Sequence, residues 1–261
     1  MKTSLHGRTA LVTGASGGLG VAFARELAAR GCALVLVARS DAPMQQLATE
    51  LRAAGVAVHV RPVDLADGAA RDALAQGLAA DGIAVDVLVN NAGFGVFGAF
   101  ADSAWSRLDG MLAVDVVALT HLTRLFLSGM RERGFGRVLQ VASTGAFQPT
   151  PSYAAYAAAK SYVLEFGYAL DAELRGSGVR CTVVSPGVTA TGFFEVSGQR
   201  ATWYQRLTGM QPAAVARRGI DAMLAGRTGV VTGMVNALVA HSTRLMPRRV
   251  SAHVAGLLMR N

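Results

Sequence analysis

A tyrosine and a lysine four residues apart, Tyr156 and Lys160, form the pair in this sequence best suited to proton transfer. A spacing of four places both side chains on one face of a helix. A free phenol has a pKa of about 10, and a neighbouring ammonium group favours the phenolate and lowers that value. Such a phenol donates a proton to a carbonyl oxygen or removes one from an alcohol. Ser143, thirteen residues before Tyr156, supplies a hydroxyl that stabilises charge developing on the same oxygen.

A glycine-rich turn near the amino terminus is suited to binding a phosphate group. Gly14, Gly18 and Gly20 follow an apolar run and open a helical pattern. Glycine lets the backbone turn sharply, so an anion can approach the helix amino terminus, where free N–H groups and the helix dipole favour negative charge. Strand, turn and helix in this order are typical of dinucleotide-binding proteins. An isolated Tyr–Lys pair is usually a surface pair, and the glycine turn together with the Ser143 spacing favours a catalytic role here.

The residues after the second expected strand predict which dinucleotide binds. An acidic side chain there hydrogen-bonds the adenosine ribose of NAD, but this sequence has Arg39 and Ser40. A guanidinium group matches phosphate oxygens, so the pair favours the 2′-phosphate of NADP(H) over NAD(H). The alternative is a solvated loop arginine with no ligand.

Apolar runs alternate with helical patterns from end to end of the chain. This alternation, with short connections, predicts an α/β fold: a doubly wound parallel sheet of about seven strands with helices on both faces. No linker divides the chain, so residues 1–261 are expected to form a single domain. Strands are predicted over residues 9–12, 33–38, 57–63, 85–89, 137–142, 179–184 and 229–233. Helices are predicted over residues 18–30, 42–54, 69–80, 103–131, 153–175, 212–224, 236–245 and 249–259.

Five motifs, in family order and at the expected strand ends, resemble the short-chain dehydrogenase/reductase family over roughly residues 7–192. Each motif is weak alone, and the order of all five identifies the chain as a member of that family. The resemblance implies a Rossmann-type fold and oxidoreductase chemistry. The motifs are Gly14–Gly20, Asp64–Leu65, Asn90–Gly93, Ser143 with Tyr156 and Lys160, and Ser185–Gly187 with Thr189 and Thr191.

The resemblance implies a role for each motif. Tyr156 would donate or accept the proton, Lys160 would also bind the nicotinamide ribose hydroxyls, and Ser143 would hydrogen-bond the substrate oxygen. The motif after the third strand would cap the adenine, and the one after the sixth would lie beside the nicotinamide. The expected cofactor-binding residues are Gly14, Ser16, Gly17, Gly18, Leu19, Gly20, Arg39, Ser40, Asp64, Leu65, Asn91, Ala92, Gly93, Tyr156, Lys160, Pro186, Gly187, Thr189 and Thr191.

One expected catalytic residue departs from the family pattern. The family has an asparagine in the long helix after Asn90–Gly93, where it holds a water on a proton relay from the lysine, and this sequence has Asp115. A carboxylate is nearly isosteric, but it cannot donate hydrogen bonds when ionised, and its charge acts on Lys160. Three alternatives follow: a working relay with carboxylate chemistry, a slower enzyme, or a binding protein that has lost turnover. Retention of Ser143, Tyr156 and Lys160 argues against the last.

The residues expected to face the substrate follow the fourth, fifth and sixth strands, because ligands bind at the carboxyl ends of parallel strands. They are mostly aromatic and include no lysine or arginine, so the substrate is predicted to be an apolar ketone, aldehyde or alcohol. Several of these residues would equally suit packing of the loop against the body of the protein. This loop, residues 190–212, is the expected substrate loop and would close over the site. The predicted substrate residues are Phe94, Phe97, Phe147, Gln148, Tyr153, Phe193, Phe194, Trp203 and Tyr204.

The basic charge of the chain lies in its last quarter. Residues 1–199 hold 16 basic and 16 acidic residues, whereas residues 200–261 hold nine arginines and one acid, Asp221. No aromatic residues alternate with the arginines of the tail, so nucleic acid is not an expected partner. Residues 234–261 are predicted to form a basic helical extension that either packs within the protein or its oligomer, or contacts an anionic membrane surface. The apolar faces of residues 103–131 and 153–175, with the family resemblance, imply a homodimer or homotetramer.

Composition excludes several classes of protein. Hydrophobic residues make up 52% and charged residues 16% of the chain, which is not typical of a disordered protein. No signal peptide or membrane-spanning helix is expected, because the amino-terminal segment is polar and the longest uncharged runs hold several polar residues. Cys32 and Cys181 lie in apolar runs and are expected to be buried, reduced thiols of a cytoplasmic protein with no metal site.

Three hypotheses of function follow from these residues. The first is an NADPH-dependent carbonyl reductase, run in reverse as an alcohol dehydrogenase. The second is a lipid-pathway enzyme, a 3-oxoacyl or long-chain keto reductase at a membrane surface. The third, from a different class, is a non-catalytic NADP-binding sensor or scaffold.

Overall fold

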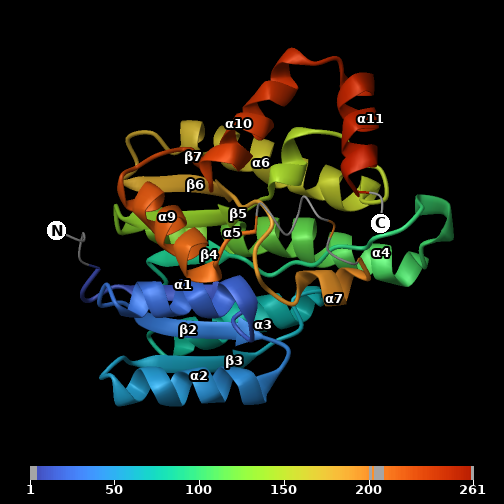
Figure 1. The fold of residues 1–261 in the computed structure, drawn as a ribbon. Helices are drawn as coiled ribbons and strands as arrows, with labels where there is room; N and C mark the ends of the chain where they lie inside the picture. Colours follow the sequence, from blue (N-terminus) through green and yellow to red (C-terminus); the bar gives the residue numbers. More distant parts are fainter. Residues whose placement is uncertain (1–4, 200–201, 203–208, 260–261) are drawn as a thin grey trace.

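Seven strands form one parallel sheet in the order β3-β2-β1-β4-β5-β6-β7 (Figure 1). The computed structural model describes residues 5–199, 202 and 209–259. Strands β1 to β3 are added toward one side of the sheet and strands β4 to β7 toward the other, so the order reverses between β1 and β4. The sheet is therefore doubly wound and Rossmann-like, as predicted. The strands are β1 (Thr9–Thr13), β2 (Ala33–Ala38), β3 (Val58–Pro62), β4 (Val87–Asn90), β5 (Gly136–Val141), β6 (Val179–Ser185) and β7 (Gly229–Val231).

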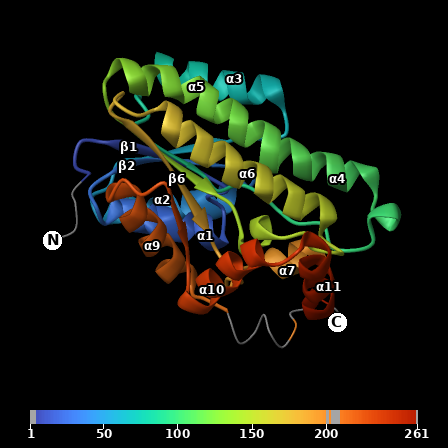
Figure 2. The ribbon, with the colours of Figure 1, turned by 90° about the horizontal axis from the view of Figure 1, so that it is seen from above.

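Helices cover both faces of the sheet, as Figure 2 shows. Each face has its own apolar core between the strands and the helices that cover them. Because both faces are buried, the central strands are almost wholly apolar, which explains their pattern in the sequence. One face carries α1 (Gly18–Ala28), α2 (Asp41–Ala53) and α9 (Pro212–Leu224), and the other carries α3 (Gly68–Ala80), α5 (Leu119–Glu132) and α6 (Ala154–Glu173).

The stretch expected to be one long helix contains a π-helical turn that the sequence pattern did not predict. α4 (Trp105–Leu112) continues through π-helical residues Ala113–Ala118 into α5. By length and composition alone, this run could cross a membrane, the one such stretch in the part of the chain that the structure describes. About a third of its most apolar window is buried. The buried side chains of α5 pack against the sheet, and a core helix of this kind meets the same criteria.

The carboxyl-terminal extension folds as a helical hairpin, which confirms the two predicted helices. α10 (Met234–Ser242) leads through a 3-10 turn (Thr243–Leu245) to α11 (Arg248–Met259). Figure 1 shows the turn of this hairpin projecting from the top of the molecule, with α11 running back toward the body.

The segment expected to be a substrate loop holds a short helix, α7 (Phe193–Ser197), that its lack of periodicity did not predict. Gly198 ends this helix in the left-handed region, with φ +84°. Trp203 and Tyr204, two of the predicted substrate residues, lie outside the described residues.

Both cysteines are free and buried, as predicted. Burial raises the pKa of both thiols, to about 12 at Cys32, so neither forms a thiolate readily near neutral pH. They act as small apolar side chains of the core.

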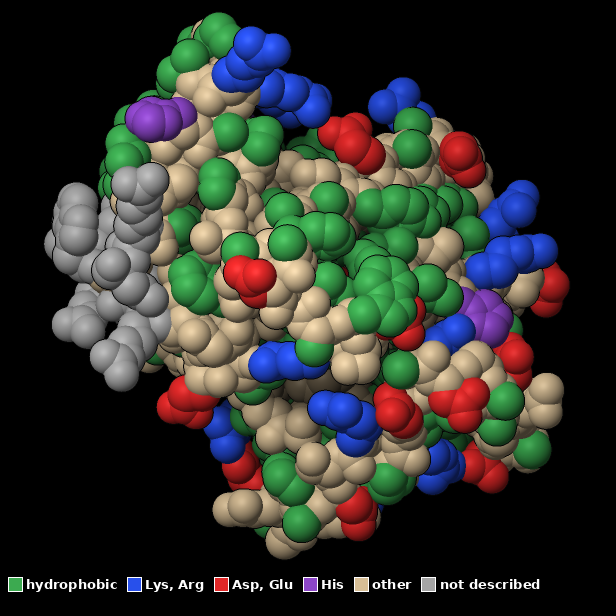
Figure 3. Space-filling model, turned by 90° about the vertical axis from the view of Figure 1, so that its right-hand side faces the viewer, with side chains coloured by type: hydrophobic (Ala, Val, Ile, Leu, Met, Phe, Trp, Pro, Cys, Tyr) green, Lys and Arg blue, Asp and Glu red, His purple; other side chains and the backbone are tan. Residues whose placement is uncertain are grey.

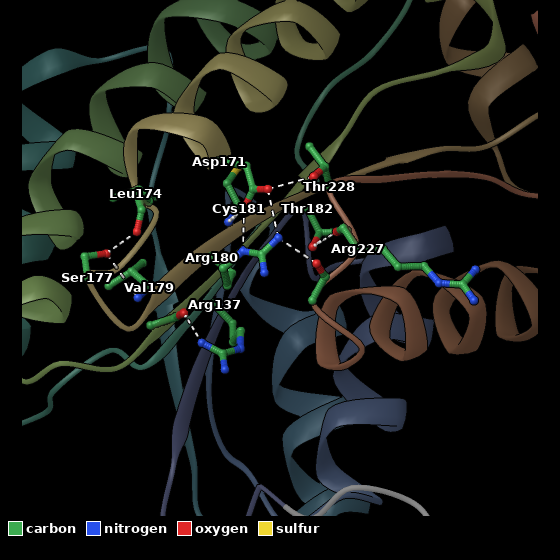
Figure 4. Close-up of polar contacts among 12 residues, drawn as sticks. Arg137, Asp171, Leu174, Ser177, Val179, Arg180, Cys181, Thr182, Arg227 and Thr228 are labelled. Carbon is green, nitrogen blue, oxygen red and sulfur yellow. Dashed lines mark hydrogen bonds and ion pairs between the residues drawn. The ribbon is translucent and has the colours of Figure 1, made fainter.

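A hydrogen-bonded ion pair joins α6, β6 and the segment before β7 at the amino edge of the sheet (Figure 4). The buried Asp171 carboxylate accepts from Nε and Nη2 of Arg180 at 2.8 and 2.9 Å. It also accepts from the Cys181 N–H at 3.1 Å and the Thr228 hydroxyl at 2.7 Å. Burial raises the pKa of Asp171, but the hydrogen bonds and the Arg180 charge outweigh burial, and the net pKa is lowered.

We predict that Asp171→Asn lowers the free energy of unfolding at neutral pH by about 2 to 3 kcal/mol, because it removes one partner of a buried charge pair. The folded-state pKa is depressed, so this contribution is present above the unfolded pKa and is lost as the pH falls through the folded value. Denaturant unfolding at several pH values measures the difference, which should shrink in acid. Asp109→Asn, at an exposed site on α4, is the control. A difference that is the same at every pH would contradict the assignment.

Candidate active site

Ser143, Tyr156 and Lys160 meet between the end of β5 and the first turns of α6. Ser143 caps the 3-10 turn Thr144–Phe147, and its Oγ accepts the N–H of Gly145 at 3.1 Å. The Ser143 hydroxyl lies near the Tyr156 ring, since a Cβ on Gly145 would be 3.5 Å from Ser143 Oγ and 4.0 Å from Tyr156 Cε1. Lys160 Nζ lies 5.7 Å from the centre of the Tyr156 ring. The structure therefore brings these three side chains together at the carboxyl edge of the sheet.

The buried Lys160 ammonium group forms an ion pair with Asp115. Lys160 Nζ lies 3.0 Å from Asp115 Oδ2, and the two side chains are 6% and 0% exposed. The other carboxylate oxygen, Oδ1, accepts the N–H of Phe94 at 3.0 Å. Lys160 also donates to the carbonyl oxygen of Val141 at 3.2 Å. Asp115 projects from the π-helical turn and contacts the lysine directly.

Tyr156 has a different electrostatic setting from the one that its spacing predicts. Burial raises the pKa of Tyr156, the Lys160 charge lowers it, and the Asp115 charge raises it again, so the net pKa is raised. The expectation of a lowered phenol pKa is therefore wrong for this structure, because burial and Asp115 together outweigh the ammonium. At Lys160, burial lowers the pKa, but Asp115 and Tyr156 outweigh burial and raise it, which keeps the ammonium charged.

Gly14 and Gly20, in the turn between β1 and α1 and at the start of α1, have no room for a side chain. Gly14 and Gly18 have φ of +66° and +51°, in the left-handed region that favours glycine. A Cβ on Gly20 would lie 2.0 Å from the Gly14 carbonyl oxygen, and one on Gly14 would lie 2.8 Å from Asn91 Nδ2. The glycines leave the backbone at the amino end of α1 uncovered by side chains, which fits the close approach of a dinucleotide pyrophosphate.

Asn91 and Ala92 are bonded directly to the strand that enters this turn. Asn91 Nδ2 donates to the Thr13 carbonyl oxygen at 2.8 Å, and the Thr13 hydroxyl accepts the N–H groups of Asn91 and Ala92, each at 2.9 Å. The next residue, Gly93, lies against the ion pair, since a Cβ there would be 2.8 Å from Asp115 Oδ1. This segment thus links the glycine turn to the Asp115–Lys160 pair.

The segment after β6 meets both the glycine turn and the serine loop. The Pro186 carbonyl oxygen accepts the N–H of Thr144, the residue after Ser143, at 2.8 Å. Thr191 lies beside the glycine turn, 3.1 Å from where a Cβ on Gly18 would be. The predicted nicotinamide-side segment is therefore placed between the cofactor turn and the reactive hydroxyls.

Arg39 and Ser40 follow β2, which pairs with β1, and Asp64 follows β3, the next strand outward. All three residues are exposed. Leu65 is buried, and the Asp64 carboxylate accepts the N–H of Ala66 at 3.1 Å. All four predicted residues lie along the same sheet edge as the glycine turn, where the adenosine end of a dinucleotide would be bound.

Four of the predicted substrate residues gather beside Tyr156. The ring centre of Tyr153 lies 5.5 Å from that of Tyr156 and 5.2 Å from that of Phe97. The Phe193 ring lies 5.4 Å from Tyr156, and Phe194 lies 5.9 Å from Phe193. The ring of Tyr156 is therefore next to a wall of aromatic rings from the start of α6, from α7 and from the segment after β4.

Two polar residues that hold this wall were missed by sequence reasoning. The Tyr153 hydroxyl is hydrogen-bonded to Ser197 Oγ at 2.9 Å and to Gln199 Oε1 at 3.0 Å. Burial raises the pKa of Tyr153 to about 12, so it acts as a neutral hydrogen-bonding group. Both partners lie in the segment without periodicity, where no motif signals the contact.

The other predicted substrate residues are placed differently. Phe94 packs, like Tyr156, against the small apolar cluster of Val96, Leu108 and Met111. The Phe147 ring lies edge-on to His241 of α10 at 6.1 Å, and the Gln148 side chain meets the Ser251 hydroxyl of α11 at 3.5 Å. Phe147 and Gln148 thus contact the carboxyl-terminal hairpin and do not join the aromatic cluster.

Residues 8–201 match the family model described as short chain dehydrogenase. The chain belongs to the short-chain dehydrogenase family. Its relatives include dehydrogenases and reductases of hydroxyl and carbonyl groups, so the protein is an NAD(P)-dependent oxidoreductase that acts on such groups.

Individual relatives cover nearly the whole chain. A ketoacyl reductase, HetN, of Nostoc sp. is 34% identical over 94% of this chain and 84% of its own. A short-chain dehydrogenase of Sphingobium yanoikuyae, solved with NADPH, is 28% identical with a TM-score of 0.81 over 92% of this chain and 95% of its own. A bulky-bulky ketone specific alcohol dehydrogenase of Comamonas testosteroni is 25% identical with a TM-score of 0.77 over 91% and 92%.

We predict that Asp115→Asn lowers the pKa of Tyr156, because it removes the negative charge that opposes the phenolate and leaves the Lys160 charge in place. Tyrosinate absorbance measured against pH, taken as the difference between each protein and its Tyr156→Phe counterpart, isolates this one phenol. Its ionisation should move to lower pH in the variant.

Asp109→Asn is the control. It removes an exposed carboxylate of α4, outside the site, and should leave the Tyr156 ionisation unchanged. An Asp115→Asn protein that titrates like the wild type would show that the carboxylate does not act on the phenol.

Proposed function

We propose that this protein is an NADPH-dependent carbonyl reductase that acts on an apolar ketone or aldehyde and, in reverse, oxidises the corresponding alcohol. The observation that carries the proposal is the setting of Tyr156, whose ring lies near Ser143 and Lys160 and packs beside other aromatic rings. A carbonyl compound seated against those rings would present its oxygen to both hydroxyls.

The proposed roles follow from these contacts. Nicotinamide dinucleotide, when bound at the glycine turn, supplies or accepts the hydride. Tyr156 donates the proton to the carbonyl oxygen in reduction and removes it from the alcohol in oxidation. Ser143 hydrogen-bonds the same oxygen and stabilises its developing charge. Lys160 binds the nicotinamide ribose hydroxyls, and Asp115 positions the Lys160 ammonium group. Of the alternatives for Asp115, this contact favours a working proton relay that uses a carboxylate over a binding protein that has lost catalytic turnover.

An apolar substrate is supported by the aromatic wall and by two relatives. The neighbour from Comamonas testosteroni is described as specific for bulky-bulky ketones, and the relative from Nostoc as a ketoacyl reductase. The second of these favours a lipid-pathway 3-oxoacyl or long-chain keto reductase as the second candidate function. The non-catalytic sensor has less support, since the reactive hydroxyls, the lysine and the bare glycine turn are all in place.

Preference for NADP(H) is supported by Arg39 and Ser40, which are exposed at the end of β2 where the adenosine ribose would lie. The neighbour from Sphingobium yanoikuyae was solved with NADPH. No acid occupies the position after the strand that would favour the ribose hydroxyls of NAD.

A cytoplasmic homodimer or homotetramer is part of the proposal. Val117, Tyr162 and Tyr168 are 51%, 40% and 42% exposed on the helical run α4–α5 and on α6, where a second copy would cover them. Buried, free cysteines are consistent with the reducing environment of the cytoplasm.

The activity is tested by NADPH oxidation across ketones and aldehydes of graded size and polarity. Tyr156→Phe should lower kcat/KM by about 10²- to 10⁴-fold, because the proton donor is lost, while NADPH binding changes little. Tyr168→Phe, an exposed tyrosine on the same helix, is the matched control and should keep full activity. Turnover that survives in Tyr156→Phe would refute the assigned role. Tight NADPH binding without turnover of any carbonyl compound would favour the sensor.

The cofactor preference is tested at Arg39. Arg39→Ala should weaken NADPH binding by about 10- to 100-fold, the loss expected for charge-assisted hydrogen bonds to a phosphate, and leave NADH binding nearly unchanged. Fluorescence titration with both dinucleotides measures this. Arg175→Ala, exposed beyond the end of α6, is the control. An equal loss of affinity for NADPH and NADH would contradict recognition of the 2′-phosphate by Arg39.

A further inference from the structure

The outer face of the carboxyl-terminal hairpin exposes large apolar side chains. Seven of the thirteen exposed large hydrophobic side chains among the described residues lie in α10, α11 and the turn between them. The buried residues of both helices lie on the opposite face, toward the body of the protein. The seven are Met234 (87% exposed), Val235 (58%), Leu238 (73%), Leu245 (89%), Val250 (49%), Val254 (41%) and Leu257 (52%).

The turn of the hairpin adds positive charge to this apolar face. Arg244, Arg248 and Arg249 are exposed on either side of Leu245, and no acidic residue follows Asp221 in the sequence. At the top of the view in Figure 3, basic and apolar side chains lie together on the projecting end of the molecule. This end therefore combines exposed apolar area with uncompensated positive charge.

The inner face of the hairpin contacts the substrate side of the site. The Thr243 hydroxyl donates to the Phe147 carbonyl oxygen at 3.1 Å, in the loop that begins at Ser143. At the other end, Gln199 Nε2 donates to the Met259 carbonyl oxygen at 3.4 Å. The hairpin is thus held over the loop and the segment that form the aromatic wall.

We propose that the hairpin docks on an anionic lipid bilayer, with the arginine turn among the headgroups and the exposed apolar side chains at the acyl boundary. A helical face that is apolar at its centre and basic at its edge suits this position. Each arginine near an anionic surface contributes about 1 kcal/mol, and no acid of the hairpin opposes it.

A second copy of this chain fits the face less well. In a two-fold contact the same patch meets itself, and this patch carries no acidic residue that could pair with the arginines of the other copy. Anionic headgroups supply the opposite charge that such a contact lacks.

Docking would place the substrate side of the protein next to the bilayer. An apolar carbonyl compound dissolved in the membrane would then reach the aromatic wall through the hairpin side of the site. This consequence rests on the proposed function, whereas the docking itself does not.

Flotation of the purified full chain with vesicles, without cofactor or substrate, tests the docking. The wild type should float with phosphatidylcholine vesicles that contain phosphatidylglycerol and much less with phosphatidylcholine alone. The triple variant Arg244→Gln, Arg248→Gln, Arg249→Gln should lose about a hundredfold in partition coefficient. The double variant Leu238→Glu, Leu245→Glu should lose at least as much, because it places charge in the apolar face.

Matched controls change the same residue types elsewhere. Phe100→Glu replaces a side chain that is 62% exposed outside the hairpin. The triple variant Arg124→Gln, Arg131→Gln, Arg175→Gln removes three exposed arginines, two on α5 and one beyond the end of α6. Both should float like the wild type, and circular dichroism confirms that every variant is folded.

Failure of the folded wild type to float with anionic vesicles would overturn the proposal, as would equal flotation of the hairpin variants. Loss of an oligomer in the leucine variant, measured by sedimentation with vesicle binding unchanged, would assign the face to a second copy instead. Turnover of a water-soluble ketone by the hairpin variants separates the two proposals, because docking can fail while the reductase remains active.

Discussion

The buried ion pair between Asp115 and Lys160 is the contact on which the site depends. It joins the π-helical turn, α6 and, through the N–H of Phe94, the segment after β4. Taking two charges out of water costs several kcal/mol per ion, and the pair is stable only with good geometry and further polar partners. Gly93 packs against the carboxylate, since a Cβ at this position would lie 2.8 Å from Asp115 Oδ1. The ion pair therefore needs glycine at this position.

Residues tied to strand ends could be predicted from the sequence, because a parallel sheet brings its carboxyl ends to one edge. Gly14 after β1, Arg39 after β2, Asn91 after β4 and Ser143 after β5 all reach that edge, and the parallel direction of the strands follows from their alternation with helices. Lys160 is placed by helical spacing, which needs no knowledge of tertiary structure.

Features that arise from packing between distant segments could not be predicted in this way. The π-helical turn around Asp115 has no periodic signal, since one extra residue in a helical turn leaves the apolar pattern almost unchanged. Phe147 follows β5 as a substrate residue would, yet His241, far along the chain, lies against its ring. The sign of the pKa shift at Tyr156 likewise depends on burial and on Asp115, neither of which the Tyr–Lys spacing contains.

The Asp115 carboxylate also bears on the protonation of Tyr156. Reduction needs a protonated phenol to donate, and oxidation needs a phenolate to accept. A neutral asparagine would leave the Lys160 charge unopposed and favour the phenolate, whereas Asp115 offsets that charge and keeps Tyr156 protonated over a wider range of pH. The same ion pair keeps Lys160 charged despite its burial, so the ammonium group remains a hydrogen-bond donor. The presence of Asp115 where the family has asparagine therefore changes the charge that acts on Tyr156 and leaves Ser143, Tyr156 and Lys160 in place.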